Sequence, residues 1–417
     1  MVSLARKNLL KDLPRFFVAQ AGILFAVSLV TIQSGILKGF TRSTTLLIDQ
    51  SRADIWVASE NLVNFELTEP FPYVLLREAQ AVPGVDRAEP LLIGSGRWYA
   101  EGGKLTTLRI FGFDPDGQLF SPGQVPPGML EALKEPYTAI IDETNQRSFR
   151  IDAVGDSARI RSLPVQVVGL TQDTQSIVSS KFVFASLENA NAYASSGFSA
   201  DLTCQLAEGG GLNCTNTYER DSQLAQAETM PPPPGELTAD APVTYLLVRA
   251  KPGTDLQVLK QRLETALPST RAFTQDELKI KTQTYWQEST GIGFILVLGS
   301  AVGVIVGMVI VAQILYTSVS EHIKEFGTLK AIGASDESIY GVIIEQALWM
   351  AVLGYVPGVL LCWGLGTWTA ATQGVVVLIT PVSALGVFGI TVLMCVGSAV
   401  FAIQKVTRVD PGIVFKA

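Results

Sequence analysis

The chain has 417 residues, of which 48% are hydrophobic and 17% are charged, and its formal net charge is −7. The charged fraction lies below the ~25% of a typical soluble domain, and the acidic balance argues against nucleic acid as a partner. Hydrophobic residues gather near the N-terminus and in the last third, whereas the middle has an ordinary soluble composition. These features predict a membrane protein with a large water-exposed domain, in roughly two to four structural units.

Residues 1–15 combine leucines with basic residues, which predicts a short amphipathic helix on the cytoplasmic face of a membrane. A solvated basic tail is the alternative. Pro14 is expected to separate this helix from the membrane helix that follows.

Residues 16–38 are predicted to form the first transmembrane helix. Phe16–Leu37 contains no charged residue, and at about 1.5 Å per residue it would span about 30 Å of hydrocarbon. A cleaved signal peptide is disfavoured, because its apolar part is usually about 7–15 residues long and ends at a small-residue cleavage site.

Residues 39–285 alternate strand-like and helix-like patterns, which predicts an α+β domain outside the membrane. Helices are predicted at 71–85 and 255–267, strands at 106–114 and 244–253, and a β-hairpin at 158–170. A strand and helix unit near each end of the region suggests that 39–135 and 226–285 form one α+β subdomain. Residues 136–225 would be a mainly β subdomain inserted into it.

Two of the four cysteines, Cys204 and Cys214, lie in this exterior region, in the segment CQLAEGGGLNC. An oxidising compartment favours a disulfide there, and the glycine run allows the chain to turn back. The other two, Cys362 and Cys395, fall within apolar stretches, where a small apolar packing role is expected.

The last third predicts three more transmembrane helices, at 286–320, 339–366 and 377–403. Ser289–Ser320 is uncharged and longer than a membrane requires, which suggests tilt or projection beyond the bilayer. Between Ile339 and Gln404 the only charge is Glu345, and the polar and small residues at 367–374 suggest the break between two helices. Glu345 is a candidate functional acid, although it is close enough to the membrane surface for its carboxylate to reach water.

Basic residues near the ends of these helices set the orientation. They precede the first helix, lie between the second and third, and follow the fourth, whereas the 367–374 loop has none: Arg6, Lys7, Lys11, Arg15, Lys324, Lys330, Lys405, Arg408 and Lys416. Both termini, the 321–338 segment and the 404–417 tail are therefore predicted to be cytoplasmic.

Signs of catalysis are weak. The sequence contains no G-x-x-x-x-G-K-[ST] phosphate-binding loop, and its single histidine excludes a histidine-rich metal site. No catalytic residue, cofactor or metal ion is expected in this chain, and an enzyme activity of its own is not predicted.

The segment 321–338 is predicted to be a cytoplasmic helix between the second and third membrane helices. Its apolar residues recur at three-residue steps, Gly333 fits a helix end, and Ser335 can cap the next helix. Such a helix either docks into a groove on a soluble partner or lies among lipid headgroups. The apolar residues are Ile323, Phe326, Leu329 and Ile332.

The sequence SEHIKEFGTLKAIGAS resembles the E-x-G-x-L-x-A-I-G-A signature of the coupling helix in FtsX/MacB-type ABC transporter permeases, also called type VII ABC exporters. Exterior segments such as VPGVDRAEP and AVGDSARIRSLPVQVVGL, and the C-terminal AIQKVTRVDPGIVFKA, are similar to the family in the same order. The ending VFKA departs from the arginine-bearing end of many members. Residues 7–59 look most like the DevC branch of cyanobacterial exporters.

This resemblance implies a fold with four transmembrane helices and a large α+β MacB-like periplasmic core domain between the first and second. It also implies a homodimer in the bacterial inner membrane that works by mechanotransmission with a separate cytoplasmic ABC ATPase dimer, which binds ATP and Mg²⁺. The ATPase would dock on Glu321, Glu325, Phe326, Gly327, Leu329, Lys330, Ala331, Ile332, Gly333 and Ala334.

The same resemblance implies export of an amphiphilic or lipid-like substrate through a periplasmic membrane-fusion adaptor and a TolC-like outer-membrane channel. Two alternatives remain open within the family. One is a permease that releases lipoproteins from the membrane, and the other is an FtsX-like regulator of a cell-wall hydrolase.

Overall fold

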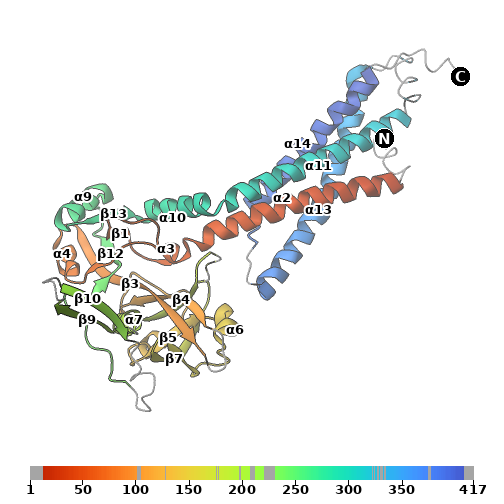
Figure 1. The fold of residues 1–417 in the computed structure, drawn as a ribbon. Helices are drawn as coiled ribbons and strands as arrows, with labels where there is room; N and C mark the ends of the chain where they lie inside the picture. The colour runs from red at the N-terminus through yellow and green to blue at the C-terminus, as the bar shows by residue number, and fades with distance from the viewer. Residues whose placement is uncertain are drawn as a thin grey trace. The chain divides into compact units, whose positions relative to one another are not determined.

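The computed structural model describes residues 13–100, 105–126, 128–174, 176, 178–196, 199–206, 212–219, 231–321, 323, 325, 328, 332, 335–373 and 377–407. The chain divides into two compact units (Figure 1). Met1–Thr41 and Gln287–Ala417 form the membrane unit, and Arg42–Trp286 forms the sheet unit. Most of the amphipathic helix predicted for 1–15 lies outside the described residues.

Four helices among the described residues are long and apolar enough to cross a membrane. They are α2 (Leu13–Ser43), α11 (Ile292–Glu321), α13 (Asp336–Gln373) and α14 (Pro381–Thr407), and Figure 1 shows them as the long helices of the membrane unit. Their candidate spans are Phe16–Ser43, Ile292–Glu321, Glu337–Thr369 and Pro381–Gln404. A four-span α-helical membrane domain is thus present.

The helix boundaries differ from the predicted ones at three places. Pro14 lies in the first turn of α2 and does not break it, because a first-turn residue needs no backbone hydrogen-bond partner. Gly291, at a φ of +62°, separates α10 (Gln275–Thr290) from α11, so the second span begins at Ile292 and not at 286. The third helix continues through the expected break at 367 as far as Gln373.

The polar residues in the extension of α13 form hydrogen bonds within the helix. The hydroxyl of Thr367 donates to the carbonyl oxygen of Gly364 at 2.9 Å, and that of Thr369 donates to Gly366 at 3.1 Å. Threonines that bond back to the preceding turn are compatible with a helix, so a cluster of small polar residues did not require a loop.

Close helix contacts hold the membrane unit together. A Cβ atom on Gly307 of α11 would lie 2.6 Å from the Cβ atom of Ala26 on α2 and 2.5 Å from the sulfur of Met394 on α14. Ser398 of α14 donates from its hydroxyl to the carbonyl oxygen of Met308 at 2.8 Å. Small residues and interhelical hydrogen bonds are the usual contacts between membrane helices, where no hydrophobic effect drives association.

The sheet unit contains a nine-stranded sheet in the order β13-β1-β12-β3-β4-β8-β5-β7-β6. The strands are β1 (Ile55–Ser59), β3 (Val85–Tyr99), β4 (Thr106–Phe113), β5 (Thr138–Asp142), β6 (Ser157–Ile160), β7 (Leu163–Thr171), β8 (Lys181–Ser186), β12 (Tyr245–Ala250) and β13 (Thr270–Thr274). Two separate pairs join β2 (Phe71–Pro72) to β11 (Pro242–Val243), and β9 (Ser199–Leu206) to β10 (Leu212–Glu219).

Short helices complete the unit. They are α3 (Leu46–Gln50), α4 (Leu75–Ala81), α5 (Met129–Ala132), the 3₁₀ turn η1 (Glu143–Asn145), α6 (Gln146–Phe149), α7 (Leu187–Ser195) and α9 (Leu256–Ala266). The predicted helix at 255–267 is therefore present as α9. Asp255 caps it, accepting a hydrogen bond from the backbone N–H of Gln257 at 2.8 Å, and Leu259 and Leu263 are its buried residues.

An additional pairing of β3 with β6 closes six strands into a ring, β3-β4-β8-β5-β7-β6. Trp98 pairs with Ile160 and Tyr99 with Arg159 at this closure. The side chains of Trp98 and Ile160 are 1% and 0% exposed, and they belong to the apolar core that the ring strands share with α7.

The ring corrects the predicted division of the exterior domain. The strands β3 and β4, which precede residue 136, belong to the ring together with β5 to β8 and are not part of a separate subdomain. The sheet also continues without interruption from β3 into β12, β1 and β13. A long strand such as β3 can pair with different partners along its length, so sequence order alone did not mark the boundary.

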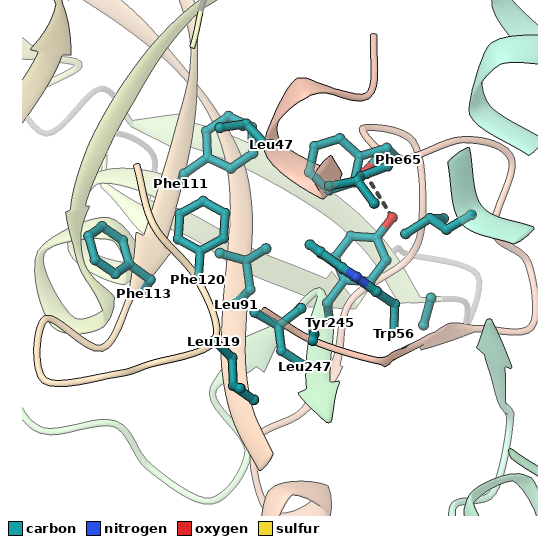
Figure 2. Close-up of a cluster of buried hydrophobic side chains, with 14 of the residues drawn as sticks. Leu47, Trp56, Phe65, Leu91, Phe111, Phe113, Leu119, Phe120, Tyr245 and Leu247 are labelled. Atoms are coloured by element: carbon teal, nitrogen blue, oxygen red, sulfur yellow. Dashed lines mark hydrogen bonds between the residues drawn. The ribbon is translucent and has the colours of Figure 1, made fainter. Parts of the chain in front are cut away.

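A second apolar core of the sheet unit gathers side chains from ring strands and from β1 and β12 (Figure 2). Its aromatic centre contains Trp56, Phe65, Phe111 and Tyr245, with the rings of Trp56 and Tyr245 5.4 Å apart at 85°. The Tyr245 hydroxyl donates to the carbonyl oxygen of Phe65 at 2.8 Å, the bond drawn in Figure 2. Burial raises the pKa of Tyr245 well above its usual value, so this hydroxyl stays protonated as a donor.

Candidate functional site: the coupling segment

We call residues 321–335, between α11 and α13, the coupling segment. Both helices are fixed close to it by buried apolar side chains. Val319 near the end of α11 and Ile339 near the start of α13 are each 1% exposed, and both belong to the apolar core of the membrane unit. A displacement of the segment would therefore act on packed helices and not on loose chain ends.

The start of α13 is capped as predicted. The Ser335 hydroxyl accepts a hydrogen bond from the backbone N–H of Ser338 at 3.4 Å, and its carbonyl oxygen accepts from the same N–H at 3.1 Å. The carboxylate of Glu337 belongs to the first turn, where the positive end of the helix dipole favours it. These contacts give the coupling segment a defined end at Ser335.

Within the segment, the structure describes only part of the predicted docking set. Glu321 and Glu325 are exposed, Ile323 is half-buried, and the Ile332 side chain is 80% exposed. The backbone N–H of Ile332 donates to the carbonyl oxygen of Thr328 at 3.0 Å, which is one helical turn. The other predicted positions lie outside the described residues: Phe326, Gly327, Leu329, Lys330, Ala331, Gly333 and Ala334.

Glu345, the candidate intramembrane acid, is half-buried on α13. It lies about 14 Å along the helix from Asp336, at about 1.5 Å per residue. Its neighbour Gln346 is 2% exposed. Among the described residues, no basic side chain pairs with Glu345. Its role stays a prediction.

Two of the four cysteines face each other on paired strands, and the other two are buried separately in membrane helices. Cys204 on β9 lies directly opposite Cys214 on β10 in the antiparallel pairing. Directly opposite residues have Cα atoms about 4.5–5.5 Å apart, within the range of about 4.4–6.8 Å that disulfides use. Cys362 and Cys395 are buried free thiols in α13 and α14, as the sequence predicted.

Gln20 and Gln33 of α2 form contacts that were not predicted, although glutamines stand out in an otherwise apolar helix. The Gln33 side-chain oxygen accepts a hydrogen bond from the Ser300 hydroxyl of α11 at 3.0 Å. Gln20 donates from its amide to the carbonyl oxygen of Met350 on α13 at 3.5 Å. These contacts link α2 to the two helices that flank the coupling segment.

The described residues contain no group of three or more His, Cys, Asp or Glu side chains that could hold a metal ion. The fold is that of a multi-pass membrane protein with four apolar helices, a large α+β domain between the first and second, and a short connection between the second and third.

Comparison with known proteins places this architecture in a family. Residues 16–266 match the MacB-like periplasmic core domain, and residues 297–411 match the FtsX-like permease C-terminal domain. The chain belongs to the MacB/FtsX family of ABC transporter permeases.

Several relatives are similar over different extents. An uncharacterized ABC transporter permease of Mycobacterium tuberculosis is 25% identical over 95% of this chain and 94% of its own length. A probable export ATP-binding/permease protein MacB of Pseudomonas entomophila is 23% identical over 57% of this chain but only 30% of that protein. The solved periplasmic region of MacB from Actinobacillus actinomycetemcomitans has 10% identity and a TM-score of 0.32, covering 54% of this chain and 90% of that one.

Proposed function

We propose that this chain is the membrane subunit of an ATP-driven exporter, that it forms a homodimer, and that a separate ABC ATPase docks on each coupling segment. Membership of the permease family supports the partnership with an ATPase. The observation that carries the docking assignment is the 80% exposure of Ile332, while Val319 and Ile339 on the two flanking helices are buried. An exposed isoleucine on a helical turn can fill a groove of a soluble partner.

In this proposal the membrane unit transmits force and has no nucleotide site of its own. ATP-driven closure of the ATPase dimer moves the two coupling segments together, and Val319 and Ile339 pass that movement to α11 and α13. The helix α11 has 30 residues, so it is a rod about 45 Å long that can carry movement across the bilayer. Both termini and the coupling segment are then cytoplasmic, in the inner membrane of a bacterium.

The cargo proposed is an amphiphilic or lipid-like molecule, which leaves the exterior domain through a membrane-fusion adaptor and a TolC-like channel. The resemblance of residues 7–59 to the DevC branch supports this class of cargo. A relative from Pseudomonas syringae that is named for probable syringafactin export aligns at 23% identity over 57% of this chain and 31% of that protein, which is consistent with export. Lipoprotein release and regulation of a cell-wall hydrolase are the competing functions.

The test uses the full chain reconstituted with the ATPase that co-purifies with it. The variants Phe326→Asp and Gly327→Leu should leave folding intact and leave ATP hydrolysis uncoupled from export, while Arg77→Gln, a change on the exposed side of α4, should behave as wild type. Coupled transport at the wild-type rate in both coupling variants would refute the docking assignment. Pull-down of the native complex separates the functions, because an adaptor with a channel supports export and a hydrolase supports regulation.

A further inference from the structure

Three arginines gather where β3 closes the ring against β6. Arg97 lies on β3, Arg159 on β6, and Arg161 in the two-residue turn between β6 and β7. Arg159 pairs with Tyr99, and the backbone N–H of Arg161 donates to the carbonyl oxygen of Arg97 at 2.8 Å. Paired residues share a face of a sheet, as do residues two apart along a strand. Arg97, Arg159 and Tyr99 therefore lie on one face, opposite the buried Trp98 and Ile160. The Arg161 guanidinium reaches the same part of β3, where it donates to the carbonyl oxygen of Ser95.

A neighbouring arginine, Arg109, has a carboxylate partner, whereas these three do not. Arg109 on β4 lies on the same face, paired with Ser95 of β3, and its Nε atom is 3.3 Å from the carboxylate of Glu66. Arg109 is thus neutralised by an acid. Among the described residues, Arg97, Arg159 and Arg161 have no carboxylate partner.

Backbone carbonyl groups hold two of the guanidinium groups in place. Arg161 donates from Nη1 to the Ser196 oxygen at 3.0 Å and from Nη2 to the Ser95 oxygen at 2.9 Å. Arg159 donates from Nη2 to the Ser162 oxygen at 3.0 Å. Carbonyl groups orient a guanidinium without cancelling its charge, so these two arginines are positioned but remain positive. Arg97 is exposed and offers its whole donor fork.

The positive charges of Arg97 and Arg161 also repel one another. Partial burial lowers the pKa of Arg161, and the positive charge of Arg97 lowers it further. Arg161 has in addition a φ of +55°, in the left-handed region that glycine and asparagine adopt more readily. Strained backbone and like charges at one place are features that functional sites retain.

We propose that Arg97, Arg159 and Arg161 form an oxyanion site that binds the phosphate or carboxylate headgroup of the exported amphiphile. Planar guanidinium groups bind such oxygens in pairs, which a lysine cannot do. Diagonal neighbours on paired strands are about 7–8 Å apart, so Arg97 and Arg159 can reach one headgroup together. The identity of the ligand as cargo rests on the proposed export function, whereas the oxyanion chemistry does not.

The small extent of the cluster formed by the three arginines favours a lipid headgroup as ligand over an acidic segment of a partner protein. All three arginines lie within two strands and one turn, and the next arginine on the face is already paired with Glu66. An extended acidic peptide would require charges spread along the sheet, as protein-docking surfaces have.

The experiment measures ligand binding by the full chain in neutral detergent micelles, without the ATPase, so that its failure is independent of any failure of export. The probes are dihexanoyl phosphatidic acid, inorganic phosphate and, as a neutral amphiphile, octyl glucoside, each titrated by calorimetry. We expect phosphatidic acid to bind, and Arg97→Gln to weaken its binding about tenfold or more, since the variant loses the charge-assisted hydrogen bonds of the guanidinium. Arg97→Lys should fall between the two, and Arg77→Gln should bind as wild type.

Each of the other outcomes supports or overturns part of the proposal. Equal affinity for inorganic phosphate would support the oxyanion site and overturn its assignment to an amphiphile. Equal binding of phosphatidic acid by wild type and Arg97→Gln, or no binding at all, would overturn the site. Loss of a co-purifying protein from Arg97→Gln without any change in phosphatidic acid binding would make this surface a protein contact and overturn the proposal.

Discussion

The carboxylate of Glu66 lies 3.3 Å from Nε of Arg109 and also accepts a hydrogen bond from the Ser179 hydroxyl. One buried acid thus connects the segment before β2, the ring strand β4 and the segment before β8. Burial is the largest influence on Glu66 and raises its pKa above the usual 4.5, and the Ser179 hydrogen bond and the Arg109 charge offset this only in part.

The first prediction follows from this raised pKa. A carboxyl group whose pKa is higher in the folded than in the unfolded state favours folding when protonated, so its contribution is present below the unfolded value of about 4.5 and is lost as pH rises through the folded value. In Glu66→Gln that loss should be absent. Urea unfolding of the full chain in micelles at a series of pH values above about 4 measures it.

The quantity to compare is the change of the unfolding free energy with pH and not its absolute value, because Glu66→Gln also leaves Arg109 without its carboxylate partner. Glu69→Gln, which removes one exposed acid nearby, serves as the control for the loss of a carboxylate. Identical pH dependence in wild type and Glu66→Gln would show that Glu66 does not titrate in this range.

The second prediction concerns Cys204 and Cys214, which face each other across the β9–β10 pair. If they form a disulfide, the mass of the native protein rises by about two hydrogens on reduction, and closure of this short loop stabilises the hairpin by about 3 kcal/mol in the chain-entropy model. Mass spectrometry of unreduced protein, denatured and treated with an alkylating reagent, should find only Cys362 and Cys395 modified. Alkylation of all four cysteines would refute the bond.

Local signals in the sequence predicted some elements well. The apolar spacing within 255–267 predicted α9, because such a pattern acts within a few residues, and Leu259 and Leu263 are its buried leucines. The hairpin at 158–170 corresponds to β6 and β7, which pair from Ser157↔Gln166 to Ile160↔Leu163. The absence of charge identified four membrane helices, since charged side chains are costly in hydrocarbon.

Non-local contacts could not be predicted in the same way. The ring closes through Trp98↔Ile160 and through the parallel pairs β4–β8 and β5–β7, all of which join residues far apart in the sequence. At the candidate site, the signature predicted a docking role for the coupling segment, which stays a prediction. It gave no indication of Val319 and Ile339, which resemble any other residue of an apolar helix. A helix that is hydrophobic on all sides carries no periodic signal to show which side is packed.

The third prediction tests the packing of the membrane unit. A larger side chain on Gly307 would meet Ala26, whose Cβ atom cannot move out of the way as the flexible Met394 can. Gly307→Leu should therefore destabilise the unit by about 1–3 kcal/mol through overpacking. Gly386→Leu on α14 is the matched control, because a Cβ atom there meets nothing within 4 Å. Thermal unfolding in micelles should show a lower midpoint for the first variant alone, and equal midpoints would refute this packing.

The fourth prediction separates docking from transmission at the coupling segment. Ile332 is 80% exposed, so Ile332→Asp should change stability by only about 0.5 kcal/mol or less while reducing the amount of ATPase that co-purifies with the chain. Ile332→Leu should restore docking, since it keeps an apolar side chain of the same size.

Ile339 is 1% exposed and packs in the core, so Ile339→Val should cost about 0.5–1.5 kcal/mol of stability through the lost methylene. Because this change leaves the exposed segment intact, the ATPase should still co-purify in wild-type amount, and transport per ATP hydrolysed should fall. The two variants thus give opposite results in pull-down and coupling assays. If Ile332→Asp retained the ATPase, or Ile339→Val lost it, the assignment of docking to the exposed turn and of transmission to the buried anchors would be wrong.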